Sequence, residues 1–379
     1  MTTDMKKFRV LLFTVLVLLV VMLYIAVYQK HVNQVPIAVP VETPSRVGVY
    51  QPVLPKLEPT VKADMEPQRG RVHVCIFTGR WRYLRILLPY LYRELRQNGG
   101  VVDKVIFAMI GFDVETQTKL KNFSTTANSV LKDEAFQFVY FKDDPLTKRM
   151  NLQPFYAKFH YYVFQRLVEN PSDVYFKLDD DIVYISPNVF STMLKNKNPS
   201  DCFIHFANIV SNWRCNWLHQ QIGVFDTEVN PKGLKIDYHP NGECGWKRAD
   251  CAEMVLRAFL YHYHNNQTRK YIFHGRNHTT DRLRFSINFF LFDVTLIDIR
   301  RIVETGRIGD DEDWWTVKYS KNAPHPNCIV GEAFVVHFSY FTTEKQMLDL
   351  GLLKEFENIV RMELGDKLPQ PLWKATEFL

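Results

Sequence analysis

Apolar and polar positions alternate in blocks from residue 72 onwards. Residues 72–78 form a short apolar run that ends at Gly79, which predicts a buried strand. Residues 83–97 carry leucines at helical spacing, and Pro89 lies among them, so we expect a helix that is kinked or split there. The sequence Asn98-Gly99-Gly100 is typical of a helix end.

The alternation continues as far as residue 178. Further apolar runs predict strands at residues 104–110, 136–141 and 173–178, and helical spacing predicts helices at residues 114–123 and 155–168. Strands that alternate with helices imply right-handed crossovers and a mostly parallel sheet, so the predicted fold class is α/β. Beyond about residue 200 the pattern is less regular, and it defines no further strands clearly.

A longer apolar run precedes this domain. Residues 10–28 are 19 residues without a charge, and as a helix they span about 28 Å, close to the roughly 30 Å of a bilayer core. Because Lys6, Lys7 and Arg9 lie before the run, the positive-inside rule predicts a type II anchor with residues 1–9 in the cytosol. A cleaved signal peptide is the alternative, but the run is longer than a signal core and lacks a small-residue cleavage site.

Residues 29–70 predict an extended stem. They contain seven prolines and a single aromatic residue, Tyr50, and such a segment cannot bury enough apolar surface to fold. The folded domain is therefore expected to comprise residues 71–379, on the lumenal side of the membrane. Three N-x-S/T sequons in it, at Asn122, Asn266 and Asn277, are candidate glycosylation sites and fit that location.

Composition narrows the classes of function. Of the 379 residues, 46% are hydrophobic and 23% are charged, which is a globular composition and excludes collagen or a disordered chain. The 47 basic residues nearly balance the 41 acidic ones, so no nucleic-acid partner is expected. The six cysteines contain no C-x-x-C pair, which argues against a zinc ribbon.

The cysteines also bear on disulfides. Cys215, Cys244 and Cys251 lie in predicted loops, and the lumen is oxidising, so we expect one or two disulfides, at least one of them within residues 202–251. Cys75 lies inside a predicted buried strand and is expected to be free.

Ligands of open α/β sheets bind beyond the carboxyl ends of the strands, and two strand ends here carry candidate chemistry. At the first, Thr78-Gly79-Arg80, a tight turn leaves backbone amides free and Arg80 can meet an anionic ligand, although an ordinary strand-to-helix turn is the alternative. At the second, Asp179-Asp180-Asp181, three carboxylates interrupt an apolar run, which is costly unless a cation neutralises them. Asp179 and Asp181 share one face of an extended chain, and their oxygens suit Mn²⁺ or Mg²⁺; a solvated acidic turn is the alternative.

A second acidic run spans residues 310–313 and is followed by two indoles, Trp314 and Trp315. Clustered carboxylates can supply a general base near neutral pH, and indole faces suit the apolar faces of sugar rings. An acidic helix N-terminus is the alternative.

The anchor, the stem, the α/β start and the strand ending in Lys177-Leu178-Asp179-Asp180-Asp181 together resemble GT-A glycosyltransferases of the secretory pathway, over about residues 71–345. The resemblance implies a Rossmann-like, mostly parallel sheet flanked by helices. It also implies Mn²⁺- or Mg²⁺-dependent transfer of a hexosyl or N-acetylhexosaminyl group. The donor would be a nucleotide-sugar, most simply a UDP-sugar, the acceptor a hydroxyl of a glycan or glycoprotein, and the location the Golgi or ER membrane.

The resemblance also assigns residues. The metal ligands would be Asp181, Asp179 and His337, since residues 335–339 deliver that histidine to the end of an apolar strand. The nucleotide-sugar would contact Thr78, Gly79, Arg80, Lys158, Asp179 and Asp180. For Lys158, a solvated helix lysine is the alternative.

The order of three aspartates, a Gly-containing loop at residues 241–246, an acidic pair and a histidine loosely resembles the Fringe and core 1 galactosyltransferase branch, although the spacing differs. That branch inverts the anomeric centre, and the base would be Asp311, with Asp310 and Glu312 as alternates. The acceptor would contact Trp246, Trp314 and Trp315. A retaining GT-A enzyme, a lumenal metal phosphodiesterase and a non-catalytic sugar-binding protein remain as alternatives.

Overall fold

The computed structural model describes residues 70–77, 79–109, 113–141, 163–164, 167–168, 170, 172–198, 200–237, 243–274, 276–278, 283–293, 311–338, 340 and 342–377. They belong to one compact unit, Met65–Leu379. The predicted cytosolic tail and anchor, and the predicted stem up to residue 69, lie outside the described residues. Among the helices that the structure does describe, none combines the length and apolar character needed to cross a bilayer.

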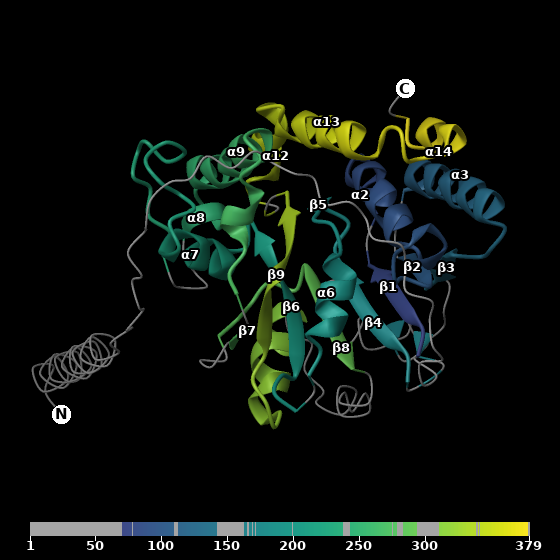
Figure 1. Cartoon of the computed structure of the whole chain (residues 1–379), viewed down its shortest axis with the longest axis horizontal. Helices are drawn as coiled ribbons and strands as arrows, with labels where there is room; N and C mark the ends of the chain where they lie inside the picture. Colours follow the sequence, from purple (N-terminus) through teal and green to yellow (C-terminus); the bar gives the residue numbers. More distant parts are fainter. Residues whose placement is uncertain are drawn as a thin grey trace, which may run out of the picture. The chain divides into compact units, whose positions relative to one another are not determined.

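The first half of the described chain alternates strands and helices, as the sequence predicts (Figure 1). Its elements are β1 (Val72–Ile76), α2 (Trp81–Glu94), β2 (Lys104–Met109), α3 (Val114–Leu131), β3 (Phe136–Tyr140) and β4 (Val174–Leu178). All neighbouring strands in the order β3-β2-β1-β4 pair in parallel. Most of the helix predicted at residues 155–168 lies outside the described residues. Of those that are described, residues 163–164 and 167 are helical and Val168 is not.

The second half completes the sheet with strands of both directions. Its strands are β5 (Ile182–Ile185), β6 (Ile204–Val210), β7 (Arg276–His278), β8 (Phe289–Asp293) and β9 (Cys328–His337). The sheet continues from β4 in the order β8-β6-β9-β5, with β7 beside β9. The β8 strand is antiparallel to both β4 and β6, and β9 is parallel to β6 and antiparallel to β5. The expected α/β class with a mostly parallel, Rossmann-like sheet is thus confirmed. The antiparallel pairs all involve β5, β7 or β8, whereas β6 and β9 are parallel to each other.

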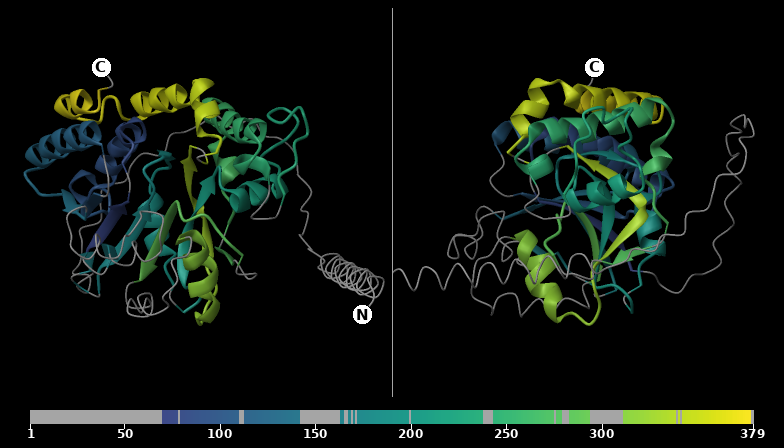
Figure 2. Two further views of the ribbon diagram at one scale, coloured as in Figure 1. Left: turned by 180° about the vertical axis from the view of Figure 1, so that it is seen from behind. Right: turned by 90° about the vertical axis from the view of Figure 1, so that its left-hand side faces the viewer.

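Helices cover this sheet on both sides. The remaining helices are α6 (Val189–Lys195), α7 (Trp213–Gln221), α8 (Glu243–Trp246), α9 (Ala249–His264), α11 (Asp311–Asp313), α12 (Glu344–Asp349), α13 (Leu352–Leu364) and α14 (Gln370–Ala375). A π-helical turn, η4 (Trp314–Tyr319), follows α11 directly. Figure 2 shows α13 and α14, in yellow, over α2 and α3, and the yellow-green segment with η4 on the opposite side of the sheet.

Helix α2 differs from its prediction in two ways. It is not split at Pro89, because the helix runs without a break from Trp81 to Glu94 and Pro89 is buried within it. It also ends earlier than expected. A short 3₁₀ turn, Arg96–Asn98, follows it, and Gly99 takes a left-handed conformation with φ of 88°, which glycine adopts without strain.

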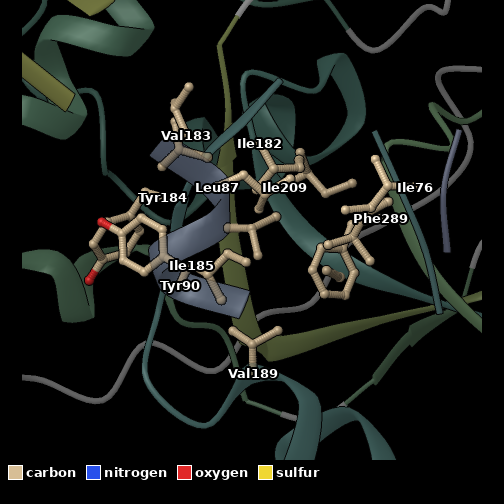
Figure 3. Close-up of a cluster of buried hydrophobic side chains, with 14 of the residues drawn as sticks. Ile76, Leu87, Tyr90, Ile182, Val183, Tyr184, Ile185, Val189, Ile209 and Phe289 are labelled. Carbon is tan, nitrogen blue, oxygen red and sulfur yellow. The ribbon is translucent and has the colours of Figure 1, made fainter. Parts of the chain in front are cut away.

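The core lies where α2 packs against the sheet. Figure 3 shows buried side chains from α2, from β5 and from the neighbouring strands, and the labelled residues are Ile76, Leu87, Tyr90, Ile182, Val183, Tyr184, Ile185, Val189, Ile209 and Phe289. Each of these side chains is at most 3% exposed. The last residue of β1 and the first residue of β5 belong to this cluster, so the turn between β4 and β5 has a rigid apolar base.

Two disulfides join elements of the second half. Cys202 and Cys328 link the starts of β6 and β9, and Cys244 and Cys251 link α8 to α9. The second bridge confirms the expectation of a disulfide within residues 202–251, and Cys75 is free and buried, as predicted. The loop placement of Cys215, Cys244 and Cys251 is wrong, because all three lie in helices. Cys244 and Cys251 belong to α8 and α9, and Cys215 lies in α7 as a free, buried thiol.

Candidate functional site

The three aspartates form the turn between β4 and β5. On one side Leu178 pairs with Ile76 of β1 and with Phe289 of β8, and on the other Ile182 pairs with His337 of β9. The backbone of the turn is also fixed, because Asp179 N donates to Asn288 O at 2.9 Å and Phe338 N donates to Asp181 O at 2.9 Å. Five strands, β1, β4, β5, β8 and β9, therefore have an end at this turn, at the edge where ligands of α/β sheets bind.

Arg80 follows β1 and places its guanidinium on the aspartates. Its Nη2 donates to Asp180 Oδ1 at 2.7 Å and to Asp181 Oδ2 at 2.6 Å, and its backbone N–H donates to Asp180 Oδ2 at 2.6 Å. Its Nη1 donates to Glu344 Oε1, at the start of α12, at 3.0 Å. One guanidinium is thus shared among three carboxylates, and negative charge stays in excess around it.

Asp181 and His337 form a buried pair. His337 Nε2 lies 3.2 Å from Asp181 Oδ2, and the two side chains are 5% and 8% exposed. Burial alone would raise the pKa of Asp181, but the charges of His337 and Arg80 outweigh it and hold that pKa below its usual range. Burial opposes protonation of His337, yet Asp181 prevails and raises the pKa of the imidazole. Asp181 therefore stays ionised at neutral pH.

The other two aspartates have different partners. Asp180 is fully buried, and burial raises its pKa even though Arg80 opposes the shift. Asp179 accepts a hydrogen bond from Asn288 Nδ2 at 2.8 Å and forms an ion pair with Lys177. Lys177 is itself buried, and its Nζ also donates to Ile287 O at 2.9 Å. The carboxylates of the turn are held by cations and amides from three different strand ends.

The residues fit a divalent cation only in part. Within the described part of the chain, no group of three His, Cys, Asp or Glu side chains is arranged to hold a metal ion. Asp181 Oδ1 and His337 Nδ1, however, are buried atoms without a hydrogen-bond partner among those residues. A site with one carboxylate and one imidazole is sufficient when substrate phosphates complete the coordination shell. Asp181 and His337 fit that role, whereas Asp179 is engaged by Lys177 and Asn288.

Aromatic residues extend from His337 towards solvent. Its ring centroid lies 5.9 Å from that of Tyr340, which in turn lies 5.7 Å from that of Trp246. The hydroxyl of Tyr340 accepts a hydrogen bond from Trp213 N at 2.9 Å, which holds that ring in place, and Thr342 Oγ1 donates to the backbone carbonyl of Trp246. Trp246 remains 37% exposed. It offers an open aromatic face two rings away from the Asp181–His337 pair.

The second acidic run begins helix α11, as the alternative interpretation expects. Asp311 is half-buried, and its Oδ1 accepts a hydrogen bond from Glu312 N at 2.8 Å. Glu312 Oε2 accepts hydrogen bonds from Arg284 Nε at 3.1 Å and Nη2 at 2.7 Å. Burial and then the charge of Glu312 raise the pKa of Tyr340, which places this carboxylate within electrostatic reach of the aromatic path from His337.

The assignment of Trp314 and Trp315 to the acceptor site is wrong. They are 6% and 1% exposed and belong to the core. The π-helical turn directs both indoles inward. Trp315 packs against Phe290 and Phe292 of β8 at 5.6 and 5.9 Å, and Trp314 stacks on Tyr319 at 4.4 Å. A local sequence pattern cannot distinguish an indole that faces a ligand from one that faces the sheet.

Several other predicted residues are placed only in part. Thr78, Lys158 and Asp310 lie outside the described residues, and Gly79 lies directly before Arg80 at the end of β1. Asn122 is exposed on α3, Asn266 is exposed after α9, and Asn277 lies in β7. Their glycosylation stays a prediction.

Sequence reasoning missed four residues of the site: Lys177, Asn288, Tyr340 and Glu344. A lysine inside an apolar strand before three aspartates is a signal that could have identified Lys177. Asn288 and Glu344 had no local signal, because they reach Asp179 and Arg80 from segments more than 100 residues away along the chain. Tyr340 lies just after the predicted His337 and contacts its ring.

Comparisons with known proteins add one finding. No protein-family model and no curated protein matches the chain. Among solved structures, a crystal structure of the galactosyltransferase LgtC in complex with donor and acceptor sugar analogues is similar at 9% sequence identity and a TM-score of 0.37. The match covers 80% of this chain and 99% of that one. This similarity is too weak to support a functional assignment, so the interpretation of the site is based on the geometry described above.

Proposed function

We propose that this protein is a glycosyltransferase that moves a sugar from a nucleotide-sugar, most simply a UDP-sugar, to a hydroxyl of a glycan or glycoprotein. The observation that supports this best is the buried turn Asp179-Asp180-Asp181, which meets Arg80 from β1 and His337 from β9 at one sheet edge. Buried carboxylates with fixed cations are costly to keep and typical of a site that binds a charged ligand.

The donor would bind at this edge. Arg80 presents a planar guanidinium that suits a diphosphate, and Asp179, which pairs with Lys177, would meet the ribose or the sugar. Asp180 is fully buried, so the predicted contact of its side chain with the donor is replaced by a role in positioning Arg80. Asp181 and His337 would hold Mn²⁺ or Mg²⁺, which when bound acts as a Lewis acid on the leaving diphosphate. Lys158 and Thr78 would extend the same subsite.

The acceptor would approach along the aromatic path. Trp246 offers an exposed indole to a sugar ring, and Asp311 would take the proton from the attacking hydroxyl in an inverting transfer. The base we propose is Asp311, the residue that the order of motifs favours, while Glu312 accepts two hydrogen bonds from Arg284. A retaining transfer would need no such base.

The decisive experiment incubates the protein with a panel of UDP-sugars and a glycan library, with Mn²⁺ or with excess EDTA. We expect Mn²⁺-dependent release of UDP that is coupled to a glycosylated product, and NMR of that product should show an inverted anomeric configuration. Release of UDP to water alone would favour a hydrolase, and binding without turnover would favour a sugar-binding protein. A product that retains the donor configuration would overturn the inverting assignment.

We also propose that the protein is a single-pass type II protein of the Golgi or ER membrane with its domain in the lumen. The charge pattern around residues 10–28 and the exposed positions of Asn122 and Asn266 support this. Protease added to intact microsomes should leave the C-terminal domain protected, and glycosidase treatment should reduce its apparent mass. Digestion of that domain in sealed vesicles would refute the topology.

A further inference from the structure

The position of the Arg80 side chain is not explained by contact with a nucleotide base or by its place at the start of α2. Its Nη2 lies 2.6 Å from Asp181 Oδ2, the same oxygen that lies 3.2 Å from His337 Nε2. A cation bound between Asp181 and His337 would therefore have a guanidinium as its direct neighbour.

The guanidinium is fixed rather than free to move away. Glu344 accepts from Arg80 Nη1 at 3.0 Å, and the same carboxylate oxygen accepts from the hydroxyl of Tyr83 at 2.5 Å. Asp180, which is fully buried, accepts from both the side chain and the backbone N–H of Arg80. Contacts from the turn after β4 and from α12 thus fix the positive charge, and Tyr83 of α2 holds Glu344 in turn.

A fixed positive charge beside a cation site has a direct electrostatic consequence. Like charges repel most strongly where the surroundings are poorly hydrated, and these side chains are largely buried. The guanidinium already bonds Asp181 Oδ2, and the protein supplies only two ligand side chains there, so a divalent cation alone must compete with Arg80 for that oxygen. A diphosphate changes the balance, since its oxygens can bond the guanidinium and the cation together.

We propose that Arg80 is a specificity-determining residue that makes the binding of a divalent cation conditional on a nucleoside diphosphate. The inference rests on the proposed function, because it assumes that the anion at this edge is the diphosphate of the donor. Arg80 then acts twice. It disfavours the bare cation, and it binds the diphosphate that brings the cation in.

The test measures Mn²⁺ binding to the full-length protein in detergent by electron paramagnetic resonance, with and without UDP. For the wild type we expect UDP to tighten Mn²⁺ binding by about 5–150-fold, the usual range of coupling between two ligands, and Mn²⁺ must tighten UDP binding by the same factor. In Arg80→Gln, Mn²⁺ alone should bind about tenfold more tightly than to the wild type, and the coupling should shrink to a few-fold.

Two variants serve as controls. Arg80→Lys keeps the charge but not the planar fork, so it should still bind Mn²⁺ weakly without UDP while its UDP affinity falls. Arg82→Gln removes an exposed neighbour that also reaches Glu344, at 3.3 Å, and should leave both Mn²⁺ affinity and coupling as in the wild type. If Arg80→Gln does not fold, tight binding of Mn²⁺ alone to Arg80→Lys would overturn the proposal, and weak binding with coupling preserved would support it.

The outcomes separate this inference from the proposed function. If the wild type binds UDP with Mn²⁺ but Arg80→Gln leaves Mn²⁺ affinity and coupling unchanged, Arg80 has only a structural role and this inference fails alone. If the wild type binds no UDP at any Mn²⁺ concentration, the proposed donor site fails and this inference fails with it.

Discussion

The two acidic runs of this chain place their carboxylates in very different surroundings. The turn at residues 179–181 lies between two buried strands, and Asp180 and Asp181 are 0% and 6% exposed. The run at residues 311–313 begins a short helix, where all three side chains are half-buried. Its Glu312 and Asp313 pair with Arg284 and Lys318, which are 39% and 58% exposed.

This difference in burial suits the two groups of carboxylates to different roles. A buried carboxylate must have fixed partners, because an unpaired buried charge is strongly destabilising, and the result is a preorganised array that can receive a charged ligand. A carboxylate near solvent is held less firmly and can exchange a proton, as a general base must. The turn is therefore suited to the donor and its cation, and the helix start to proton transfer.

Substitution of Asp181 is expected to have the largest effect on turnover and UDP binding. Asp181→Asn removes the charge that holds both His337 and Arg80, so we expect a loss of turnover on the order of 10³-fold and no Mn²⁺-dependent UDP binding. Turnover assays and calorimetric titration measure the two quantities. The matched control is Asp313→Asn, which breaks a surface ion pair worth about 0–1 kcal/mol and should leave both unchanged. Equal losses in the two variants would remove the distinction between the runs.

The next effect concerns Asp311. Asp311→Asn keeps the side-chain shape but removes proton acceptance, so kcat should fall by about 10²–10⁴ while UDP affinity stays the same. Steady-state kinetics and a separate UDP titration distinguish the two parameters. Glu312→Gln should cost less, because it only weakens the bonds to Arg284. Near wild-type kcat in both variants would mean that this run does no chemistry and only begins a helix.

Two tryptophans, the buried Trp315 and the exposed Trp246, are expected to respond differently to substitution. Trp315→Ala should reduce the free energy of unfolding by about 3–5 kcal/mol, since it leaves a cavity against β8. Trp246→Ala should change stability little and raise the acceptor KM about tenfold, which corresponds to roughly 1.4 kcal/mol of lost contact. Thermal unfolding and acceptor kinetics on both variants test the pair. A raised acceptor KM in Trp315→Phe without a change in stability would return that residue to the acceptor site.

The smallest effect is a pH dependence at the turn. Asp181 raises the pKa of His337, so the imidazole keeps its proton to a higher pH in the folded state than in the unfolded state. The stabilisation that protonated His337 provides is fully present below pH of about 6.5, and it is lost as the pH rises through the higher folded pKa. The free energy of unfolding should thus decline above that pH without metal, by at most about 1.4 kcal/mol per unit, and His337→Gln should remove the decline.

His219 provides the control of opposite sign. Burial lowers its pKa to about 3, so the folded state binds fewer protons than the unfolded state below pH of about 6.5, and stability falls towards acid. His219→Gln should reduce only that acid-side loss, as denaturant titrations across pH would show. A change above neutral pH in this variant would assign the alkaline decline to something other than His337.

The early strands and the aspartate turn could be predicted from local pattern. Each is encoded within a few consecutive residues, as in the apolar run before Gly79 and the three carboxylates that interrupt another run. The same holds for the strand that ends at His337. The later strands were not predicted, because β8 pairs with β4 and β6 from a distant part of the chain.

Residue type and apolar periodicity are local properties, so the amino-acid sequence alone predicts an α/β domain with three carboxylates at a strand end. Which charges meet at that strand end follows from the folded arrangement of the chain. Glu344 and Asn288 reach the turn from more than 100 residues away, and Trp315 faces the core rather than solvent. The physical reason is that contacts between distant segments depend on how the sheet is ordered and how its helices pack, which no local pattern encodes.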